Sequence, residues 1–429
     1  MPTPYAYQHP RDQILEAMER IYRYRMTTTS GGNLSIREAN GDVWITPARV
    51  DKGGLRREDI VCIRSGGHIE GTRRPSSELP IHQEIRRRRT ELGGIVHAHP
   101  SALVAFSLVH RVPDTRLFHQ ARRVCGEPGF APYELPGSVA LGNRVADTFE
   151  QGYDCVILEN HGVVAAGPDL QQAFRRFETL EFTAKTLIKA RLLGGDVRFL
   201  SDADLELERQ RGGNPEEFAA APPSSHEIEV RRRLCEFVRR AYRQRLFIST
   251  QGSYSARVDA ESFLITPYQV DRGTLDLQDL VLIRNGHREA GKSPSRAAQL
   301  HEAIYRRNPA VGSILNAYPV NVTAFSVTGV EFNSRTIPES YVVIRQVGRV
   351  PFGMQFLDPG ELANLVSPTQ PALILENDGV LVTGSDVLEA FDRLEVLEST
   401  AEAIINCRAL GSLMPLPEQV TRELDAAFF

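Results

Sequence analysis

The sequence contains no long hydrophobic run, few cysteines and little net charge. No stretch reaches the roughly 20 apolar residues that span a membrane, and the first residues lack the apolar core of a signal peptide. The five cysteines are odd in number and include no CxxC pair, which argues against a disulfide framework and for a reducing compartment. A formal net charge of −4 gives no reason to expect nucleic-acid binding. We therefore expect a cytoplasmic protein whose partners include neither a membrane nor a nucleic acid.

What the sequence does contain is an internal repeat. Residues 30–64 read SGGNLSIREANGDVWITPARVDKGGLRREDIVCIR and align without a gap on TQGSYSARVDAESFLITPYQVDRGTLDLQDLVLIR at 250–284. Three further pairs follow in the same order: PSSELPIHQEI (75–85) with PSRAAQLHEAI (294–304), IVHAHPSALVAFS (95–107) with ILNAYPVNVTAFS (314–326), and VILENHGVVAAG (156–167) with LILENDGVLVTG (373–384). Chance similarity does not keep register over such a span, so the chain is a duplication.

The repeat predicts two domains, in agreement with the length of 429 residues. We place the first domain at 1–195, a linker at 196–226 and the second domain at 227–429. The linker is rich in glycine, proline and glutamate and loses the hydrophobic period. Within the first copy, short apolar strands such as 155–160 alternate with amphipathic helices, the last of which covers about 169–193. This alternation predicts an α/β fold.

Three histidines of the first copy are placed to bind a metal ion. His97 and His99 form an H-x-H pair at the end of a predicted strand, where side chains two apart point to the same face. His161 follows another apolar strand within an NHG turn. Three imidazoles with one open position are the arrangement of a catalytic zinc site. A single histidine is more often structural, so the prediction depends on the three together.

The second copy has lost the proposed ligands as a group. His97, His99 and His161 correspond there to Asn316, Tyr318 and Asp378, and Glu78 corresponds to Ala297. By contrast, His82 persists as His301, which predicts a structural role for it. The second copy is therefore expected to keep the fold without the metal.

Glu78 is the candidate proton-transfer group of the first copy. It stands at the start of a predicted helix, directly after Ser76 and Ser77. A carboxylate beside a bound metal can act as general base on a carbon acid whose carbonyl the metal polarises. The alternative is an acid that stabilises the helix N-terminus. The SGGNLS turn at 30–35 and the two serines could supply N–H and O–H donors to an anion.

These residues closely resemble the class II aldolase/adducin family. The shared motifs are GN-x-S, the ITP strand end, PSSE-x-x-x-H, H-x-H and NHG, in the family's order over residues 11–193. The resemblance implies two tandem class II aldolase-like domains, each a mixed β-sheet flanked by helices. It also implies oligomers, often fourfold, with active sites between neighbouring subunits.

The resemblance assigns roles residue by residue. His97, His99 and His161 would bind a divalent metal, zinc before manganese or cobalt, and Glu78 would be the acid/base. A further set would hold the substrate phosphate, namely Asn33, Ser76 and Ser77, with Gly32. Where sugar-phosphate aldolases of the family continue the ITP segment with Thr-Gly, this chain has Ala48 and Arg49. Arg49 could bind a phosphate, or a carboxylate in bidentate fashion.

A second departure concerns the proton donor. Fuculose-phosphate aldolases carry a tyrosine in the segment after H-x-H, whereas the first copy reads RLFHQARRVCGE and has His119 and Arg122 nearby. The second copy carries Tyr341, in IPESYVVIRQVG, near the position of the family tyrosine. We therefore expect Tyr341 to reach the metal site of an adjacent first-copy domain, the alternative being a core or interface tyrosine. His119 is a further catalytic candidate.

Together these observations predict a metal-dependent lyase that cleaves a carbon–carbon bond. The expected reaction is retro-aldol cleavage of a small phosphorylated keto-sugar or hydroxy-keto acid, with the metal stabilising the enediolate. The alternatives are decarboxylation or dehydration of an acidic substrate and, in another class, a non-catalytic scaffold like the adducin head. A homodimer would form a four-domain ring in which live and silent sites alternate.

Overall fold

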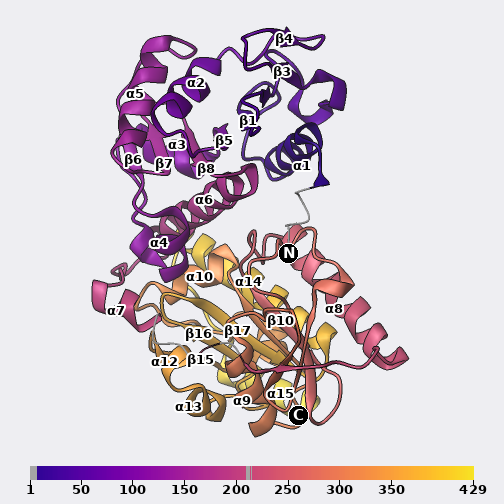
Figure 1. Ribbon diagram of the computed structural model, residues 1–429. Helices are drawn as coiled ribbons and strands as arrows, with labels where there is room; N and C mark the ends of the chain where they lie inside the picture. The colour runs from indigo at the N-terminus through magenta and orange to yellow at the C-terminus, as the bar shows by residue number, and fades with distance from the viewer. Residues whose placement is uncertain (1–6, 209–212, 214) are drawn as a thin grey trace. The chain divides into compact units, whose positions relative to one another are not determined.

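The computed structural model describes residues 7–208, 213 and 215–429, which separate into two compact units (Figure 1). Unit 1 comprises the chain up to Thr115 together with Gln120–Lys185, and unit 2 comprises Arg116–His119 and Thr186–Phe429. Each unit is built on one β-sheet flanked by helices. The predicted α/β class and the tandem arrangement are therefore confirmed.

The sheet of unit 1 has eight strands in the order β4-β3-β2-β1-β5-β8-β7-β6. Neighbouring strands are antiparallel except β6 and β7, which are parallel, so the sheet is mixed as predicted. The strands are β1 (Asn33–Arg37), β2 (Val43–Ile45), β3 (Val61–Ile63), β4 (Ile69–Glu70), β5 (Gly94–Ala98), β6 (Gly129–Ala131), β7 (Cys155–Leu158) and β8 (Val163–Gly167).

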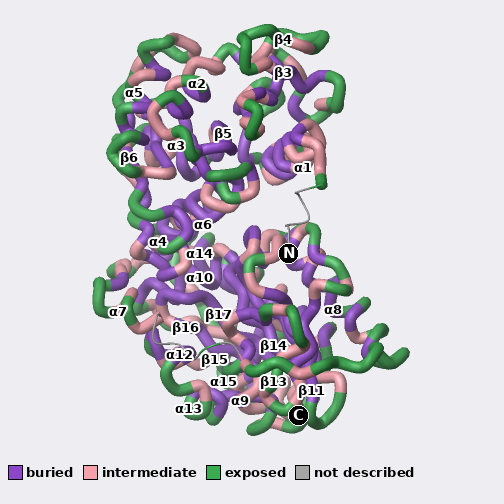
Figure 2. Tube along the Cα trace, viewed as in Figure 1, coloured by how far each residue is buried: buried purple, intermediate pink, exposed green. Residues whose placement is uncertain are grey.

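The central strands of this sheet position the candidate site. In the ladder, Asn33 of β1 stands opposite His97 of β5, and His97 stands opposite Val164 of β8. Residues of β5, β7 and β8 are buried throughout (Figure 2). The side chains at these strand ends are therefore held by a rigid, fully hydrogen-bonded ladder.

Helices cover the sheet of unit 1. They are α1 (Pro10–Arg23), α2 (Leu79–Arg88), α3 (Ser101–Leu108), α4 (His119–Cys125), α5 (Val139–Glu150) and α6 (Leu170–Leu193), with short 3-10 turns at Lys52–Gly54, Arg57–Asp59 and Thr115–Leu117. The last of these turns, the first residue of α4 and the end of α6 extend into unit 2, which includes Arg116–His119 and the chain from Thr186. Helices α2 and α5 pack on the sheet through a core that includes Ile81, Ile85, Ile95, Val145, Phe149 and Val164.

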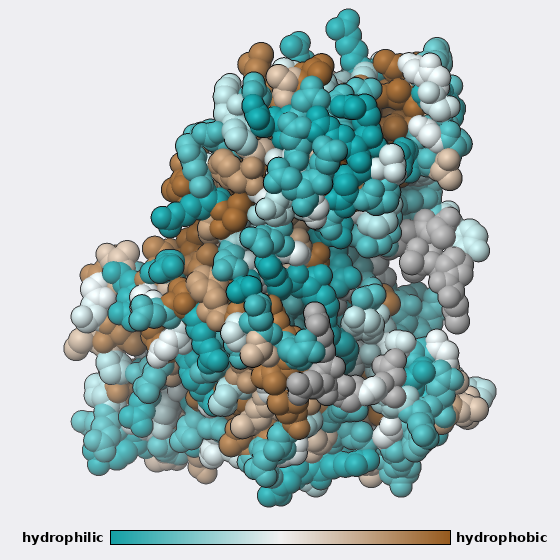
Figure 3. Space-filling view, turned by 60° about the vertical axis from the view of Figure 1, so that its left-hand side comes forward, coloured by the Kyte–Doolittle hydropathy of each residue, from teal (hydrophilic) through white to brown (hydrophobic). Residues whose placement is uncertain are grey.

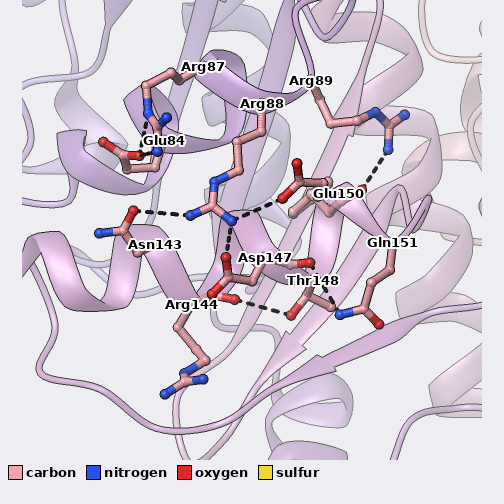
Figure 4. A network of polar contacts seen from close by, with 11 residues as sticks. Glu84, Arg87, Arg88, Arg89, Asn143, Arg144, Asp147, Thr148, Glu150 and Gln151 are labelled. Atoms are coloured by element: carbon pink, nitrogen blue, oxygen red, sulfur yellow. Dashed lines mark hydrogen bonds and ion pairs between the residues drawn. The ribbon is translucent and has the colours of Figure 1, made fainter.

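Polar contacts also join α2 to α5. The Arg88 guanidinium binds Asp147 and donates to Glu150 Oε2 at 3.3 Å and Asn143 Oδ1 at 3.2 Å (Figure 4). Because α2 begins directly after Glu78, these contacts help to fix the helix that presents the candidate base.

The sheet of unit 2 repeats this order and adds a ninth strand. Its order is β15-β16-β17-β14-β10-β11-β12-β13-β9, with parallel pairs at β15–β16 and β13–β9. The strands are β9 (Glu217–Phe218), β10 (Ser253–Arg257), β11 (Ser262–Ile265), β12 (Val281–Arg284), β13 (His287–Glu289), β14 (Ser313–Ala317), β15 (Val347–Val350), β16 (Ala372–Leu375) and β17 (Gly379–Gly384). Strand β9 lies within the predicted linker, so part of that segment pairs with the second domain.

The helices of unit 2 are α7 (Asp202–Leu207), α8 (Ser225–Arg243), α9 (Ala298–Arg307), α10 (Val320–Ser326), α11 (Pro338–Ile344), α12 (Met354–Leu357), α13 (Pro359–Asn364), α14 (Val387–Cys407) and α15 (Glu418–Phe428). The core includes Phe263, Ile265, Ile304, Ile314 and Leu381. Among the described residues, no helix is both long and apolar enough to cross a membrane. On the face seen in Figure 3, hydrophilic side chains predominate over separated hydrophobic areas.

Candidate metal centre and its counterpart in the second unit

The three predicted histidines of unit 1 meet at one point. The ring centroids of His97, His99 and His161 lie 4.8–5.0 Å from one another, and one ring nitrogen from each falls within a 4.8 Å cluster. The Nε2 atoms of His97 and His99 are 3.1 Å apart. The H-x-H spacing and the NHG turn therefore bring together the residues that the sequence selected.

Glycines allow this close approach. A Cβ atom on Gly162 would lie 2.5 Å from Cδ2 of His99, and one on Gly31 would lie 3.0 Å from its Nδ1. Asn160, which precedes His161, adopts a left-handed conformation (φ 51°), as asparagine tolerates better than most residues. These positions fix His99 and His161 through the backbone around them.

The donor set of the cluster fits a divalent metal ion. His97 is fully buried, and its Nδ1–H donates to the Val163 carbonyl at 3.0 Å, which directs Nε2 into the cluster. Burial, followed by the charge of His97, lowers the pKa of His99 to about 3 and that of His161 to about 4. His99 and His161 are therefore neutral, the form of imidazole that binds zinc and similar ions. Burial would lower the pKa of His97, but the charge of Glu78 and its hydrogen bond outweigh it and raise that pKa, so His97 would release the Nε2 proton when a metal binds.

Glu78 joins the cluster and does not cap the helix. Its Oε2 lies 3.2 Å from His97 Nε2 and its Oε1 lies 3.3 Å from His161 Nε2. At the N-cap position of α2 its side chain makes no capping hydrogen bond, so any stabilisation of the helix N-terminus by Glu78 would be electrostatic alone. Burial would raise the pKa of Glu78, but the charges of His97 and His161 and the hydrogen bonds from His97 and Asn33 outweigh it and hold that pKa well below its usual range.

A directional hydrogen-bond chain ends on Glu78. Arg86 Nη2 donates to Ser35 Oγ at 2.7 Å; since arginine cannot accept, the serine hydroxyl donates to His82 Nδ1 at 2.6 Å. His82 Nε2–H then donates to Asn33 Oδ1 at 2.5 Å, and Asn33 Nδ2 donates to Glu78 Oε2 at 2.7 Å. We call this the Arg86–Glu78 chain. It shows that His82, for which the sequence predicts a structural role, also fixes the amide that faces the candidate base.

Lys52 is a buried residue of this region that the sequence analysis missed. It is 3% exposed, and its Nζ donates to the Pro47 carbonyl at 2.8 Å. Burial lowers its pKa to about 8, against an opposing contribution from the charge of Glu78. The available signal was weak, because the second copy has Arg272 at the same place and a basic residue in both copies resembles ordinary surface charge.

The residues predicted to hold an anion differ in burial and backbone conformation. Gly32 has a φ of +73°, and a Cβ there would meet the His97 carbonyl at 2.9 Å. Ser76 is buried and its Oγ accepts the Glu78 backbone N–H at 3.2 Å, whereas Ser77 is exposed. Arg49 is exposed and left-handed, with a φ of 54°.

In unit 2 the polar side chains at the corresponding positions have hydrogen-bond partners within the unit. Asp378 accepts from Tyr318 Oη at 3.1 Å and from Gln355 Nε2 at 3.0 Å, and its Oδ1 lies 2.8 Å from His119 Nε2. Asn316 Oδ1 accepts from His301 Nε2 at 2.7 Å. The ligand positions of the first copy are thus occupied in the second by Tyr318 and Asp378, which bind each other, and by Asn316, which binds His301.

The two further catalytic candidates belong to unit 2, whereas the three histidines belong to unit 1. His119 belongs to unit 2, where it is buried beside Asp378, although it precedes residues of unit 1 in the chain. The Tyr341 hydroxyl donates to both carboxylate oxygens of Asp425 at 3.1 Å, also within unit 2. Burial, followed by that hydrogen bond, raises the pKa of Tyr341.

The family model described as "Class II Aldolase and Adducin N-terminal domain" matches residues 12–188 and 232–405. The two matches confirm the resemblance and the duplication. An L-fuculose phosphate aldolase from Methanococcus maripaludis is 32% identical over 175 residues, which are 40% of this chain and 93% of that relative.

Other relatives differ in their named activity. A 5-deoxy-D-ribulose 1-phosphate aldolase from Bacillus thuringiensis serovar kurstaki is 30% identical, covering 46% of this chain and 93% of the relative. A 3-oxo-tetronate 4-phosphate decarboxylase from Haemophilus influenzae is 28% identical, covering 47% and 97%. Among solved structures, an L-fuculose 1-phosphate aldolase is 28% identical, covers 46% of this chain and 93% of its own, and has a TM-score of 0.42.

Proposed function

The chain belongs to the class II aldolase and adducin family, and we propose that its first copy is a metal-dependent lyase that cleaves a carbon–carbon bond. The substrate would be a small phosphorylated keto-sugar or hydroxy-keto acid, and the reaction a retro-aldol cleavage. The observation that carries the proposal is the Glu78 carboxylate within 3.3 Å of two of the three clustered histidines. Relatives named as sugar-phosphate aldolases support the substrate class.

His97, His99 and His161 would hold the metal, with zinc favoured by three imidazole ligands. When bound, a divalent ion there polarises the carbonyl oxygen of the substrate. His97 is oriented for this role by its bond to the Val163 carbonyl.

Glu78 would move the proton at the carbon next to the carbonyl. In cleavage, a hydroxyl proton leaves, the electron pair of the broken bond passes to that carbon, and a proton is added there. Asn33 fixes the Glu78 carboxylate in place through its amide N–H. Gly32, Asn33, Ser76 and Ser77 would bind the phosphate, and Arg49 would bind a phosphate or a carboxylate.

The group that exchanges the hydroxyl proton would come from a neighbouring domain. Tyr341 of an adjacent chain is our candidate, within a homodimer of two tandem chains. Its present bond to Asp425 would have to open for that role. His119 remains a second candidate, and its place beside Asp378 makes it the weaker one.

Decarboxylation is the second candidate function. It is favoured by Arg49, which stands where phosphate-binding aldolases of the family have glycine, and by the resemblance to a named decarboxylase over 97% of that relative. A carboxylate bound by Arg49 would suit an acidic substrate.

The test combines metal analysis with product identification. The purified full chain, loaded with zinc, manganese or cobalt, is incubated with phosphorylated ketoses and with phosphorylated 3-oxo acids, beside His97→Ala as the metal-free control. Release of dihydroxyacetone phosphate supports the aldolase and release of carbon dioxide supports the decarboxylase. Metal-loaded protein that releases neither product would favour the scaffold instead.

A further inference from the structure

A small cavity of unit 1 is lined by Arg86, the first residue of the Arg86–Glu78 chain. Its volume is about 190 Å³, and it lies where α2 faces the ends of β1, β2 and β3. Its lining consists of Arg37, Val43, Ile63, Leu79, Gln83 and Arg86. Three aliphatic side chains form its walls, and the exposed Gln83 stands at its mouth.

Arg86 is a buried cation without an acidic partner in this cavity. It is only 6% exposed, and it forms no ion pair with any residue that the structure describes. Its Nη2 donates to Ser35 Oγ and to the Gly93 carbonyl at 3.1 Å, while its Nε, also buried, has no hydrogen-bond partner among those residues. Burial, and then the nearby Arg37, lower the pKa of Arg86 to about 9. A buried charge left in this state is costly unless an anion accompanies it.

The second copy replaces the cation and one aliphatic wall of the cavity with aromatic side chains. Phe263 stands in place of Val43 and Tyr305 in place of Arg86, and the centroids of these two rings are 5.0 Å apart. Arg257, the counterpart of Arg37, lies over the Tyr305 ring at 4.6 Å. The cation and the aliphatic residue of its lining thus change together between the copies, as expected if both serve one ligand.

We infer that this cavity binds a small organic carboxylate with a short hydrocarbon chain. The carboxylate would pair with the guanidinium groups of Arg86 and Arg37, whose planar donor fork matches it. The hydrocarbon would lie against Val43, Ile63 and Leu79. These aliphatic walls favour a monoanionic carboxylate over phosphate, which carries more charge and no apolar part. The site is independent of the reaction proposed for the metal centre.

The test is a methyl NMR titration of the full chain with butanoate. Selectively labelled methyl groups of Val43, Ile63 and Leu79 should shift in a saturable way, and the same shifts should appear in His97→Ala, where a carboxylate has no metal to bind. Butanamide, which has the same shape without the charge, should bind about tenfold more weakly or worse. Absence of saturable shifts at these methyls, or equal binding of butanamide, would overturn the site. Inorganic phosphate that displaces butanoate at lower concentration would overturn the carboxylate class.

Variants taken from the second copy sharpen the result. Val43→Phe should fill the cavity and abolish the remaining shifts at Ile63 and Leu79. Gln83→Glu, the residue found at 302, places a negative charge at an exposed position of the mouth, so it should weaken butanoate several-fold without disturbing the fold. If both variants bind butanoate as the wild type does, with folding verified by circular dichroism, the ligand lies elsewhere and the proposal is wrong.

Discussion

The two copies satisfy the same buried histidine in different ways. In unit 1, His82 Nε2 donates to Asn33 on β1, and in unit 2 His301 Nε2 donates to Asn316 on β14. Asn316 occupies the place of His97, which is the ladder partner of Asn33. The asparagine that accepts the hydrogen bond thus lies on β1 in unit 1 and on the neighbouring strand β14 in unit 2, and the buried histidine has an amide acceptor in both copies. The comparison separates a requirement of the fold, the paired histidine, from the ligands, which the fold can lose.

The two copies also differ in how hydrogen-bond donors and acceptors are matched at the positions of the metal ligands. Unit 2 places Asp378 among hydrogen-bond donors that include Tyr318 and Gln355. Unit 1 instead places three imidazoles and Glu78 around one point, and two of the imidazoles face the carboxylate rather than a hydrogen-bond donor of the kind found in unit 2. Five predictions test this contrast.

The largest effect should follow loss of one metal ligand. His97→Ala removes the buried imidazole that its neighbours cannot replace, so we expect loss of bound metal and of all activity. Metal is measured by elemental analysis of the purified chain, with an expected content of about one equivalent, since three ligands occur only in the first copy. Asn316→Ala is the matched control and should retain that equivalent. Two equivalents in the wild type, one of them lost in Asn316→Ala, would contradict the contrast.

Glu78→Gln should retain the metal and lower kcat by about 10²-fold or more, the size expected for a general base. The amide has nearly the same shape but cannot carry the proton. Steady-state kinetics on the substrate identified by product analysis measure the change. The same substitution at the equivalent place, Ala297→Gln, should leave kcat unchanged. Near-normal turnover in Glu78→Gln would remove Glu78 from the mechanism.

Lys52 should make the stability of the first copy depend on pH, whereas Arg272, its counterpart in the second copy, should not have this effect. With a folded pKa of about 8 and an unfolded value near 10.5, the unfolded chain binds more protons between these two pH values. The contribution of Lys52 to the free energy of unfolding should therefore increase as pH rises through this window, by about 2 kcal/mol between pH 8 and 9.5.

Urea unfolding of the wild type and Lys52→Arg measures this gain as the difference between the two proteins, in which other titrating groups cancel. The difference should be constant below about pH 7, where the lysine is charged in both the folded and the unfolded state. A difference that does not change up to pH 10 would show that Lys52 titrates normally.

His82 and His301 should behave alike in stability and differently in catalysis. Substitution by alanine at either position leaves buried polar groups unpaired and should lower the free energy of unfolding by about 1–3 kcal/mol. Only His82→Ala should lower kcat, by about tenfold with KM unchanged, because only that histidine holds an amide against a base. His82→Gln, which can still donate to Asn33, should recover part of kcat. Equal kcat in wild type and His82→Ala would reduce His82 to a structural residue.

The features that the sequence predicted correctly depend on residue patterns within short segments. The H-x-H spacing places two side chains on one face of a strand, because side chains alternate between the faces, and the NHG turn provides the third histidine. The histidine cluster could therefore be predicted from the strand alternation and the turn motif. The repeat supplied the comparison that selected Glu78 over His82. Both signals depend on short segments whose geometry the sheet imposes.

The features that were missed depend on contacts between distant segments. Whether Lys52 is buried is decided by how the loop after β2 packs, which charge alone does not reveal. The catalytic candidate His119 lies in the short segment Arg116–His119, which belongs to unit 2 although unit 1 residues precede and follow it in the chain. No periodicity marks such a segment. Pairing of β9 with β13 inside the predicted linker is likewise a long-range contact of only two residues.

The smallest expected effect concerns Arg49, whose left-handed backbone has φ 54°. Its counterpart Gln269 has φ 58°, so the turn is a property of both copies. Glycine adopts this conformation without the steric penalty of about 1–2 kcal/mol, but it loses more conformational entropy on folding. Arg49→Gly and Gln269→Gly should therefore each raise the free energy of unfolding by no more than about 1 kcal/mol. Thermal unfolding measures both.

Kinetics then separate the copies. If Arg49 binds the anionic part of the substrate, Arg49→Gly should raise KM several-fold while Gln269→Gly leaves it unchanged, and Arg49→Lys should restore only part of the loss because lysine cannot bind in bidentate fashion. An unchanged KM in Arg49→Gly would leave the strained turn as a feature of the fold alone, retained in both copies without a role in binding.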